Sequence, residues 1–586
     1  MPGGPPMTAV LAEEAAVVPV ATARGKPWLA SYPAGVPAQI DTGVYGSLVD
    51  LLSEAFRKHA QRDAAICMGQ RISFREIDRL SEQLGAWLQA QGLKQGDRVA
   101  IMMPNLLQYG VAIAAILRAG FVVVNVNPLY TPRELQHQLK DSGARAIIVL
   151  ENFAHTLAEV IDATEVHHVV LASMGDLLNW WKGPLINFAV RHVKKLVPEF
   201  RLRVGEGRTV VRFNEALGHG ERLHLKKPAL GPDDVAFLQY TGGTTGLSKG
   251  ATLLHRNVVA NILQVEAWFQ PMLAKLPQGM QLTNVCALPL YHIFALTACY
   301  MLGARMGHLN ILVPNPRDIP GFIDTLRGHK IHIFPAVNTL FNALANEPGF
   351  ARLDFSELVI SNGGGMAVQQ ATAEKWLKVT GCPVVEGYGL SETAPAATIN
   401  PLDLRAFNGS IGLPIPGTEI AIRDDDGRDL ALGERGEICI RGPQVMAGYW
   451  KRPDETANVM YADGFFKSGD IGIMDERGFV RIVDRKKDMI LVSGFNVYPT
   501  EIEQVVSLHP GVLECAAVGV PDAKSGEAVK LFVVKSDPAL AEEDLMSYCA
   551  QQLTAYKRPR YIEFRADLPK TNVGKILRRE LRSEGA

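Results

Sequence analysis

The sequence predicts an α/β protein: a large N-terminal domain of mostly doubly wound sheets plus a small antiparallel β section, followed by a small α+β C-terminal domain. Three observations support this fold class. Helical patterns alternate with short Val- and Ile-rich runs from Tyr45 to about Val235, which is typical of βαβ units. From Gly417 the strands are interrupted by polar residues and joined by tight turns, as in antiparallel sheets. Past Asp484 the charged run DRKKD breaks the strand pattern, and the remaining chain has helices and strands of its own.

The alternation can be followed element by element through the large domain. The spacing of apolar residues predicts helices, and short apolar runs predict buried strands. In chain order the predicted elements are a helix at Phe74–Gly92, a strand over DRVAIMM, a helix at Leu106–Ala119, strands over FVVVNV, Ala144–Leu150 and Val235–Gln239, and a helix from His255. The runs NVCALP, ELVIS and PVVE continue the buried strands.

The C-terminal stretch has a different order of predicted helices and strands. Its predicted elements are a helix near Pro499–Leu508, strands over VLECAAVGV and AVKLFVVK, a helix near Glu542–Leu553 and a last strand near Arg560–Phe564. We therefore divide the chain into residues 1–40, a leader rich in Ala, Val and Pro that we expect to be disordered, residues 41–486, the large domain, and residues 487–586, the small domain.

Composition narrows the class of protein. The chain has 586 residues, of which 47% are hydrophobic and 21% charged, with a formal net charge of −1. We expect no nucleic-acid partner, because nucleic-acid binding usually requires a strongly basic face. Seven scattered cysteines without a CxxC pair indicate reduced thiols in a cytoplasmic protein and no zinc site. Glu13 and Glu14 interrupt the first apolar run, which argues against a signal peptide.

Two further apolar stretches bear on membranes. Tyr109–Val126 is cut by Arg118 and Gly120, so we interpret it as a buried helix and strand rather than a membrane span. The segment Asn179–Arg203 begins with two tryptophans, Trp180 and Trp181. One helical face of the segment is apolar, with Leu185, Ala189, Val193 and Leu196. The opposite face is basic, with Arg191, Lys194 and Lys195. A surface helix packed on its own domain is the simpler interpretation. Peripheral contact with an anionic membrane, at the inner face of the cell membrane, is the alternative.

The segment YTGGTTGLSKGA, Tyr240–Ala251, is the strongest functional signal. Four glycines and four hydroxyl residues lie between the predicted strand that ends at Gln239 and the helix that begins at His255. Glycines let backbone N–H groups turn toward one concavity and hydroxyls add donors, so the segment predicts a polyphosphate cradle. It is not a Walker loop, because Lys249 follows Ser248 and precedes Gly250. An ordinary glycine-rich loop is the alternative.

Four further stretches carry side chains suited to a nucleotide. EGYGLSET, Glu386–Thr393, follows the strand PVVE, and ligands of open α/β sheets gather at such strand ends. DGFFKSGD ends in Asp470, a carboxylate able to accept both hydroxyls of a ribose. DRKKD contains Arg485, and PKTNVGKILRREL offers Lys575 on a glycine-containing loop. Each alone has an ordinary surface interpretation, but their order along one chain favours a shared site.

With these motifs in place, the chain resembles the adenylate-forming superfamily of acyl-CoA synthetases, luciferases and nonribosomal-peptide adenylation domains. The resemblance extends from about Tyr45 to Arg582. PLYHIFALT, EGYGLSET, VDRKKDMILVSGFNVYPTEIE and PKTNVGKILRREL are similar to the bacterial long-chain-fatty-acid–CoA ligases, and Asp463–Lys487 resembles the fatty-acyl-CoA synthetase signature. The implied reaction has two halves. A fatty-acid carboxylate attacks the α-phosphate of ATP, giving acyl-adenylate and pyrophosphate, and coenzyme A then displaces AMP.

The resemblance implies a role for each matching position. Catalytic roles fall to Lys575, Glu392, His292 and Thr244, and Mg²⁺ would be bound by Thr244 and Glu392. Lys575 would bridge the attacking carboxylate and the α-phosphate, Tyr388 would lie against the adenine, and Asp470 with Arg485 would fix the ribose. The full set implied for ATP and coenzyme A is Thr241, Gly242, Gly243, Thr244, Thr245, Gly246, Lys249, Gly363, Gly364, Gly365, Glu386, Gly387, Tyr388, Gly389, Ser391, Asp470, Ile482, Arg485, Gly494 and Lys575.

The family also implies movement, since its small C-terminal domain is thought to rotate between the two half-reactions. Lys487 matches the hinge, and rotation would bring Gly494 of the VSGFN loop to the pantetheine route. His292 and Phe294 match the segment that borders the acyl pocket. Leu296 stands where some long-chain relatives place a gating tryptophan, so the gate is in doubt; Phe465 and Ser468 replace the usual Trp and Thr.

Several alternatives stay open. Within the family, these are an acyl-AMP ligase that loads an acyl carrier protein and a ligase for medium-chain or aryl carboxylates. From another class, the alternative is a non-catalytic nucleotide- or acyl-chain-binding protein, against which the presence of Lys575, Glu392 and Asp470 argues. A second copy of the chain, in a homodimer, is a further candidate partner.

Overall fold

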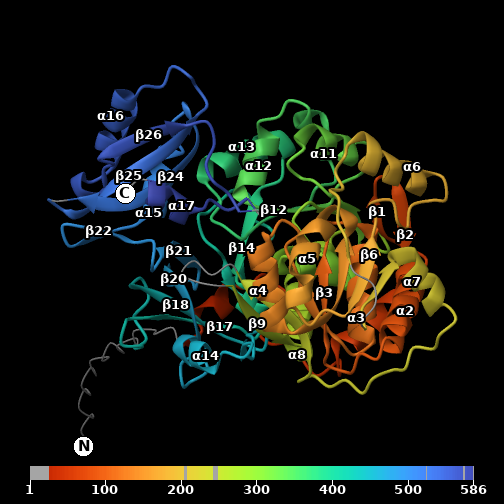
Figure 1. Ribbon diagram of the computed structural model, residues 1–586. Helices are drawn as coiled ribbons and strands as arrows, with labels where there is room; N and C mark the ends of the chain where they lie inside the picture. The colour runs from red at the N-terminus through yellow and green to blue at the C-terminus, as the bar shows by residue number, and fades with distance from the viewer. Residues whose placement is uncertain (1–24, 203–206, 242–247, 523, 572–573, 585–586) are drawn as a thin grey trace, which may run out of the picture.

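The computed structural model describes residues 25–202, 207–241, 248–522, 524–571 and 574–584. In this part of the chain, two large sheets and their covering helices form the body of the molecule, and a smaller antiparallel sheet stands next to a separate C-terminal lobe (Figure 1). The predicted fold class is confirmed.

The first large sheet has parallel strands at its centre and antiparallel strands at both edges. Its order is β16 (Leu413–Pro414), β15 (Ala396–Ile399), β14 (Val384–Gly389), β13 (Ile360–Gly363), β12 (Ile333–Ala336), β10 (Thr283–Cys286), β11 (Leu309–Leu312), β1 (Asp63–Cys67) and β2 (Gln70–Ser73). Strands β10, β11 and β12 are buried along their whole length, as expected where helices cover both faces. The motif EGYG forms the carboxyl end of β14.

The second large sheet is parallel from β8 to β7 and antiparallel at its other edge. Its order is β19 (Gly448–Tyr449), β9 (Lys249–Leu254), β8 (Val235–Thr241), β4 (Val122–Asn125), β3 (Arg98–Met102), β5 (Ala144–Leu150), β6 (His168–Ala172) and β7 (Thr209–Arg212). The predicted strand over 144–150 is found at those residues.

The helices of the large domain cover these sheets (Figure 1). They are α1 (Leu48–Lys58), α2 (Phe74–Ala90), α3 (Leu107–Arg118), α4 (Pro132–Ser142), α5 (Ala154–Val160), α6 (Lys182–Phe188), α7 (Phe213–Gly220), α8 (His255–Leu273), α9 (Ile293–Ala295), α10 (Leu302–Met306), α11 (Ile319–Leu326), α12 (Asn338–Ala345), α13 (Gln370–Thr380) and α14 (Pro453–Val459). Helix α3 is buried on nearly all sides, which accounts for its apolar sequence. Within the described ranges, no helix has both the length and the apolar character needed to cross a membrane.

The small antiparallel sheet has the order β17 (Glu419–Arg423), β18 (Arg435–Arg441), β20 (Phe466–Met474) and β21 (Val480–Arg485). A turn at residues 486–488 then leads into the C-terminal lobe. The elements of this lobe are β22 (Ile490–Val492), β23 (Phe495–Val497), α15 (Pro499–Val506), β24 (Val512–Asp522), β25 (Gly526–Lys535), α16 (Glu542–Gln552), β26 (Tyr561–Arg565) and α17 (Arg578–Glu584). Each element predicted for the small domain is present within two or three residues of its expected bounds.

The surroundings of the glycine-rich segment differ from the prediction. Strand β9 pairs antiparallel with β8, with Lys249 opposite Thr241, so the next described element after β8 is a strand and not a helix. Helix α8 begins only after β9, at the end of that strand away from Lys249. Gly242, Gly243, Thr244, Thr245 and Gly246 lie outside the described residues.

The predicted leader is also partly wrong. Residues 25–40 pack on the large domain, beginning with the short helix η2 (Pro27–Ser31), in which Trp28 is only 2% exposed. The Tyr32 hydroxyl donates to the Pro414 carbonyl at 2.5 Å, which ties this segment to β16. A single buried tryptophan and this hydrogen bond order a stretch whose Ala- and Pro-rich composition suggested disorder.

Candidate active site

Two adjoining cavities lie where the large domain meets the C-terminal lobe. The first cavity, of about 170 Å³, has walls from both, and the second, of about 420 Å³, extends into the large domain. Several residues line both cavities, among them Gly365, Gly387, Tyr388, Gly389, Arg485 and Lys575. Most of the described residues in the predicted site therefore surround one connected space, although they come from distant parts of the chain.

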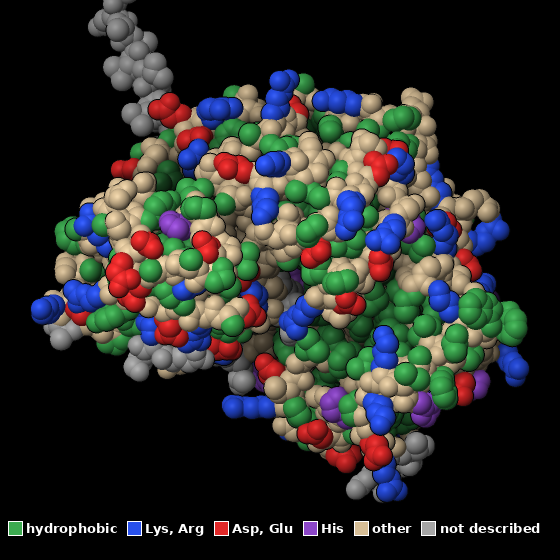
Figure 2. All heavy atoms as spheres, turned by 90° about the horizontal axis from the view of Figure 1, so that it is seen from above, with side chains coloured by type: hydrophobic (Ala, Val, Ile, Leu, Met, Phe, Trp, Pro, Cys, Tyr) green, Lys and Arg blue, Asp and Glu red, His purple; other side chains and the backbone are tan. Residues whose placement is uncertain are grey.

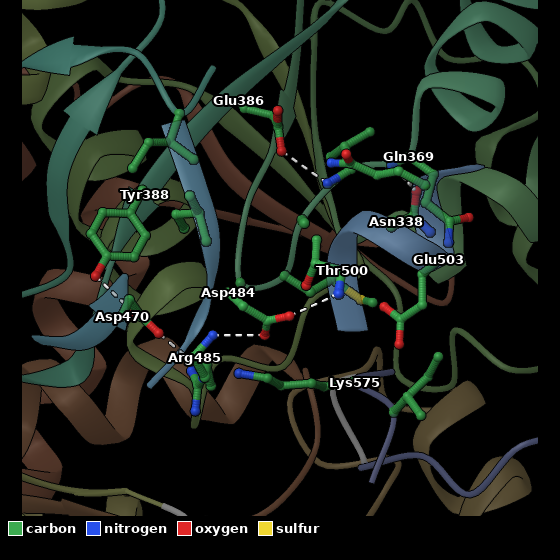
Figure 3. A pocket seen from close by; sticks show the side chains of 18 of the residues that line it. Asn338, Gln369, Glu386, Tyr388, Asp470, Asp484, Arg485, Thr500, Glu503 and Lys575 are labelled. Atoms are coloured by element: carbon green, nitrogen blue, oxygen red, sulfur yellow. Dashed lines mark hydrogen bonds and ion pairs between the residues drawn. The ribbon is translucent and has the colours of Figure 1, made fainter. Parts of the chain in front are cut away.

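Tyr388, Asp470 and Arg485 form a hydrogen-bonded cluster in the first cavity (Figure 3). The Tyr388 hydroxyl donates to Asp470 Oδ2 at 2.7 Å, and Arg485 Nε lies 3.3 Å from Asp470 Oδ1. Pairing of β20 with β21 sets Asp470 directly opposite Arg485, so sheet register alone brings these residues together. Ile482 lines the same cavity. The arrangement holds a buried carboxylate with both oxygens oriented, which suits recognition of neighbouring hydroxyl groups.

Lys575 reaches into the space from a loop of the C-terminal lobe (Figure 3). Thr339 Oγ1 of the large domain donates to the Gly574 carbonyl at 3.0 Å and fixes the loop from outside. Within the loop, the Lys575 backbone N–H donates to Thr571 Oγ1 at 3.0 Å. Burial, with the nearby Arg485 charge, lowers the pKa of the Lys575 amine to about 7. The amine is therefore poised to gain charge when an anion arrives.

His292 lines the second cavity beside residues that make one part of it apolar, including Val265, Phe269, Ile293 and Leu302. Burial, with the Lys575 charge, lowers the pKa of His292 to about 4, so its ring is neutral at physiological pH. Its Nδ1 accepts a hydrogen bond from the Phe294 backbone N–H at 3.3 Å, which assigns the remaining proton to Nε2. The ring thus offers one N–H donor.

Leu296 is fully buried and heads the π-helical turn η6 (Leu296–Met301). From this turn it is Thr297 and Ala298 that line the cavity.

Glu392 and Lys249 stand at another part of the second cavity. The buried Glu392 carboxylate accepts a hydrogen bond from the Tyr449 hydroxyl at 2.7 Å, and burial raises its pKa. Lys249 Nζ pairs with Glu455 at 2.6 Å and lies 5.4 Å from the centre of the Tyr449 ring. Thr241 and Ser391 line this cavity too. A carboxylate and an ammonium group therefore face the same space from two sides.

The glycines of the site make room for backbone and aromatic neighbours. A Cβ on Gly364 would lie 3.0 Å from the Phe294 ring, and one on Gly389 would collide with the Pro395 carbonyl. Gly363 packs against Val368 and Val384 behind the cavities. Glu386 turns away from Tyr388, and its carboxyl accepts from the Val368 N–H at 2.8 Å (Figure 3). Burial raises the pKa of Glu386 to about 8, which makes it a neutral wall residue at physiological pH.

Besides Gly363, two predicted positions lie outside the cavity linings. Gly494 is in the exposed turn between β22 and β23, with φ at +84°. Lys487 is in the turn that follows β21, and burial beside Arg485 lowers the pKa of its amine to about 8.

Sequence reasoning missed Tyr449, the partner of Glu392, and Thr339, the anchor of the Lys575 loop. The aromatic run GYW at 448–450 was a usable signal for Tyr449. The residues around Thr339 in the sequence give no sign of its role as the anchor of the Lys575 loop.

The site suits a cation that prefers oxygen ligands and takes most of them from substrate and water, not from protein side chains. In the described residues, no three His, Cys, Asp or Glu side chains are clustered so that they could hold a metal. Glu392 contributes one buried carboxylate at the cavity wall. Mg²⁺ is often bound by one or two carboxylates together with substrate phosphates and water, which matches this single ligand.

Comparisons with known proteins agree with the geometry. The family model described as AMP-binding enzyme matches residues 52–450, and the model described as AMP-binding enzyme C-terminal domain matches residues 501–575. A long-chain-fatty-acid–CoA ligase of Escherichia coli O157:H7 is 56% identical, over 95% of this chain and 98% of its own.

Solved structures match the chain over nearly its whole length. ATP-bound MatB from Rhodopseudomonas palustris, 28% identical, matches with a TM-score of 0.77, covering 92% of this chain and 98% of that one. Apo MatB from the same organism, 27% identical with the same coverage, matches with a TM-score of 0.67. Over the whole chain, the similarity to the ATP-bound structure is thus higher than that to the apo structure.

Proposed function

The chain belongs to the AMP-binding enzyme family, and from that premise we propose that it ligates a long-chain fatty acid to coenzyme A through an acyl-adenylate, releasing AMP and pyrophosphate. The observation that carries the proposal is the position of Lys575, whose side chain lines both the first cavity, which contains Asp470, and the second cavity, which contains Val265 and Phe269. The E. coli relative named above supports the choice of substrate.

In the adenylation half-reaction, the first cavity would hold the adenosine. Tyr388 would lie against the adenine, and Asp470, already oriented by Tyr388 and Arg485, would accept the ribose hydroxyls. The apolar part of the second cavity would take the acyl chain, where each buried methylene contributes about 0.8 kcal/mol. Lys249 and Thr241 would face the β- and γ-phosphates.

Charge stabilisation would come from two side chains. When the fatty-acid carboxylate attacks the α-phosphate, negative charge builds beside Lys575, and a preorganised group of this kind typically contributes about 10²–10³ in rate. The neutral His292 ring would donate its Nε2 proton to an oxygen of the reacting groups. Exclusion of water by the closed C-terminal lobe would strengthen both interactions.

Mg²⁺ would be held by Glu392, with the phosphates as further ligands, and when bound it would neutralise the leaving pyrophosphate. Tyr449 would orient the carboxylate through its 2.7 Å hydrogen bond.

The second half-reaction requires Lys575 to leave, because the thiol of coenzyme A must reach the same carbonyl. We propose that residues 487–586 move as one domain relative to residues 41–486, with Lys487 as the hinge, and that Gly494 then lines the pantetheine route. The position of Lys487 in a turn between two sheets supports this role. Lys487→Pro should therefore spare adenylation and stop thioester formation.

The proposed function is tested by pyrophosphate release from the purified chain with ATP and Mg²⁺, across carboxylates from acetate to oleate, with and without coenzyme A. We expect release with long-chain acids and acyl-CoA formation only with coenzyme A. Transfer to an acyl carrier protein instead would identify an acyl-AMP ligase, and a preference for medium-chain or aryl acids would correct the substrate class. No release with any acid would reject the ligase.

We also propose that the enzyme acts in the cytoplasm and touches the inner face of the cell membrane through residues 179–202. The polar side of this segment faces the domain: Arg191 pairs with the buried Glu151 at 2.9 Å, and Asn187 Oδ1 accepts from the Gly175 N–H at 2.7 Å. Gly175 and Gly183 pack so closely that a Cβ on Gly175 would lie 2.3 Å from the Gly183 carbonyl oxygen.

The apolar side of the same segment faces solvent. Trp180 is 87% exposed and Val193 69%, and further large apolar residues are exposed beside them: Trp181, Leu185, Phe188 and Leu196. Figure 2 shows hydrophobic side chains gathered at the right-hand edge of the molecule, the side on which Figure 1 places α6. Exposed Lys194, Lys195 and Arg201 lie in the same segment. Interfacial tryptophans with basic neighbours suit an anionic bilayer.

This contact is tested by co-sedimentation with vesicles of anionic and of zwitterionic lipid. Trp180→Ala combined with Phe188→Ser should weaken binding to anionic vesicles about tenfold or more, since two large side chains no longer insert. Leu223→Ser, an exposed leucine elsewhere, is the matched control and should bind as the wild type does. Equal binding by all three proteins would contradict the proposed surface. A homodimer stays a prediction that analytical ultracentrifugation can check.

A further inference from the structure

Asp484 joins the large domain to the C-terminal lobe. It lies near the end of β21, paired with Ile471 in the small antiparallel sheet, and its side chain is only 1% exposed. Its Oδ2 accepts a hydrogen bond from the Thr500 backbone N–H at 2.7 Å, in the first turn of α15 (Figure 3). Tyr498, at the N-cap of that helix, provides no side-chain cap. A carboxylate of one domain therefore caps a helix of the other, where the helix dipole favours negative charge.

Arg578, the first residue of α17, completes the contact from just after the loop that carries Lys575. Its guanidinium group makes a bidentate pair with Glu503 of α15, at 2.6 and 3.1 Å. The same group lies 3.3 Å from Asp488 and 3.6 Å from Asp484. Arg578 follows Lys575 by three residues, so the position of the guanidinium group and the position of the Lys575 backbone are linked.

Asp484 stands on one side of the turn at Lys487, and its partners Thr500 and Arg578 stand on the other. Asp484 precedes that turn and is held by β20, whereas Thr500, Glu503 and Arg578 follow it and belong to the C-terminal lobe. A rotation about Lys487 would separate them. Asp484 would lose its helix N–H and its cation together and keep the Arg485 backbone N–H, which its Oδ1 accepts at 2.7 Å. A buried carboxylate that loses its cation and one of its N–H donors is costly.

We propose that Asp484 is a positioning residue for adenylation, and that its contacts with Thr500 and Arg578 hold the C-terminal lobe in the arrangement that keeps Lys575 in the cavity. The inference rests on the two-step reaction of the proposed function, and it deepens that reaction by naming the group that favours its first step. Asp484 itself touches no reacting atom in this role; it acts through α15 and Arg578 on Lys575.

The test separates the two half-reactions in single-turnover experiments. Adenylation is measured as pyrophosphate released from ATP and a long-chain acid, and thioester formation as acyl-CoA made from preformed acyl-AMP. Asp484→Ala should slow adenylation by about 10- to 100-fold, the loss expected for one charge-assisted hydrogen bond, and leave thioester formation unchanged or faster. Asp484→Asn keeps an acceptor for the Thr500 N–H but not the charge, so its loss should be smaller.

Two control variants and a second assay distinguish a positioning role of Asp484 from a general loss of structure. Arg578→Gln should slow adenylation, and Arg579→Gln, which removes an exposed charge from the next position, should not. Trypsin should cut the turn at Lys486 and Lys487 faster in Asp484→Ala than in the wild type, because the lobe leaves the closed arrangement more often. This cleavage assay needs no catalysis.

The outcomes separate this inference from the proposed function. If the wild type releases no pyrophosphate with any acid, the ligase reaction is wrong, and unchanged trypsin cleavage in Asp484→Ala would then also remove the positioning role. If the wild type is active but Asp484→Ala adenylates normally, or loses both half-reactions equally, the positioning role alone is overturned.

Discussion

ATP binding should place a proton on the Lys575 amine. In the structure, burial and the Arg485 charge lower the pKa of this amine to about 7. A triphosphate beside it adds negative charge at short range, which favours the charged form and raises the pKa again. At pH 8 a group with a pKa of about 7 is only ~10% protonated, so full charging on binding would take up ~0.9 proton for each ATP bound.

The uptake can be measured by titration calorimetry at pH 8 with ATP and Mg²⁺ in the absence of a fatty acid, so that no reaction follows. The observed heat, plotted against the ionisation enthalpy of several buffers, gives the number of protons taken up as its slope. Lys575→Ala is the matched variant, because it removes the titrating group and leaves other sources of proton exchange in place. The difference between the two slopes reports Lys575 alone.

The pH dependence has a defined sign. At pH 6 the amine is already charged in the free protein, so the difference in slope between wild type and Lys575→Ala should shrink toward zero. At pH 8 it should be largest. If the two proteins take up the same number of protons at pH 8, Lys575 does not meet the phosphates of bound ATP, and the assignment of its role falls.

Three further predictions follow from single contacts. Between pH 4.5 and about 8 the folded Glu386 carboxyl keeps a proton that the unfolded one releases, so the free energy of unfolding of the wild type should fall as pH rises. Glu386→Gln removes this titration and should flatten the pH dependence. Denaturant unfolding at a series of pH values measures it. Tyr449→Phe should raise the Mg²⁺ concentration for half-maximal pyrophosphate release about tenfold, because Glu392 loses its orienting donor; an unchanged Mg²⁺ requirement would contradict it. Gly574→Ala should slow adenylation about tenfold or more and spare thioester formation from acyl-AMP, since its φ of +81° disfavours a side chain and the added Cβ would lie 2.5 Å from Thr339 Oγ1.

Much of the fold was accessible from local patterns. Buried parallel strands are short apolar runs, which is why the strand at 144–150 was predicted to the residue. Amphipathic helices such as α2 show their period plainly, and a capping box of Ser73 and Glu76 marks where that helix begins.

The errors have physical causes. Strand β9 was missed because its residues KGATLL run directly into an apolar helix, and sequence alone does not show that they pair with β8. The burial of Trp28 was missed because one aromatic residue in an Ala- and Pro-rich stretch gives no repeating hydrophobic pattern. Its pocket is formed by residues such as Gly478 that are hundreds of positions away.

The sequence motifs indicated which residues belong to the site, but not which side chains contact one another there. Recognisable polar residues lie near the ends of β14 and β21 and in the middle of β20, and sheet register brings Asp470 opposite Arg485. The partners that tune these groups come from unrelated segments: Tyr449 for Glu392, Glu455 for Lys249 and Thr339 for the Lys575 loop. A contact between two positions so far apart depends on the packing of whole domains, which no local pattern records.

The shifted pKa of Lys575 connects the chemistry with the movement. A permanently charged lysine would be costly to bury in the closed arrangement before ATP arrives, and it would bind the adenylate strongly after pyrophosphate leaves. An amine with a pKa of about 7 avoids both problems, because it is charged chiefly while phosphate oxygens surround it. Once the β- and γ-phosphates depart, only the α-phosphate charge would remain beside the amine, so the charged form would be favoured less and the proposed opening of the lobe would cost less electrostatic energy. The contacts of Asp484 would remain the main electrostatic hold on the closed lobe, so their strength would set how readily the enzyme passes from the first step to the second.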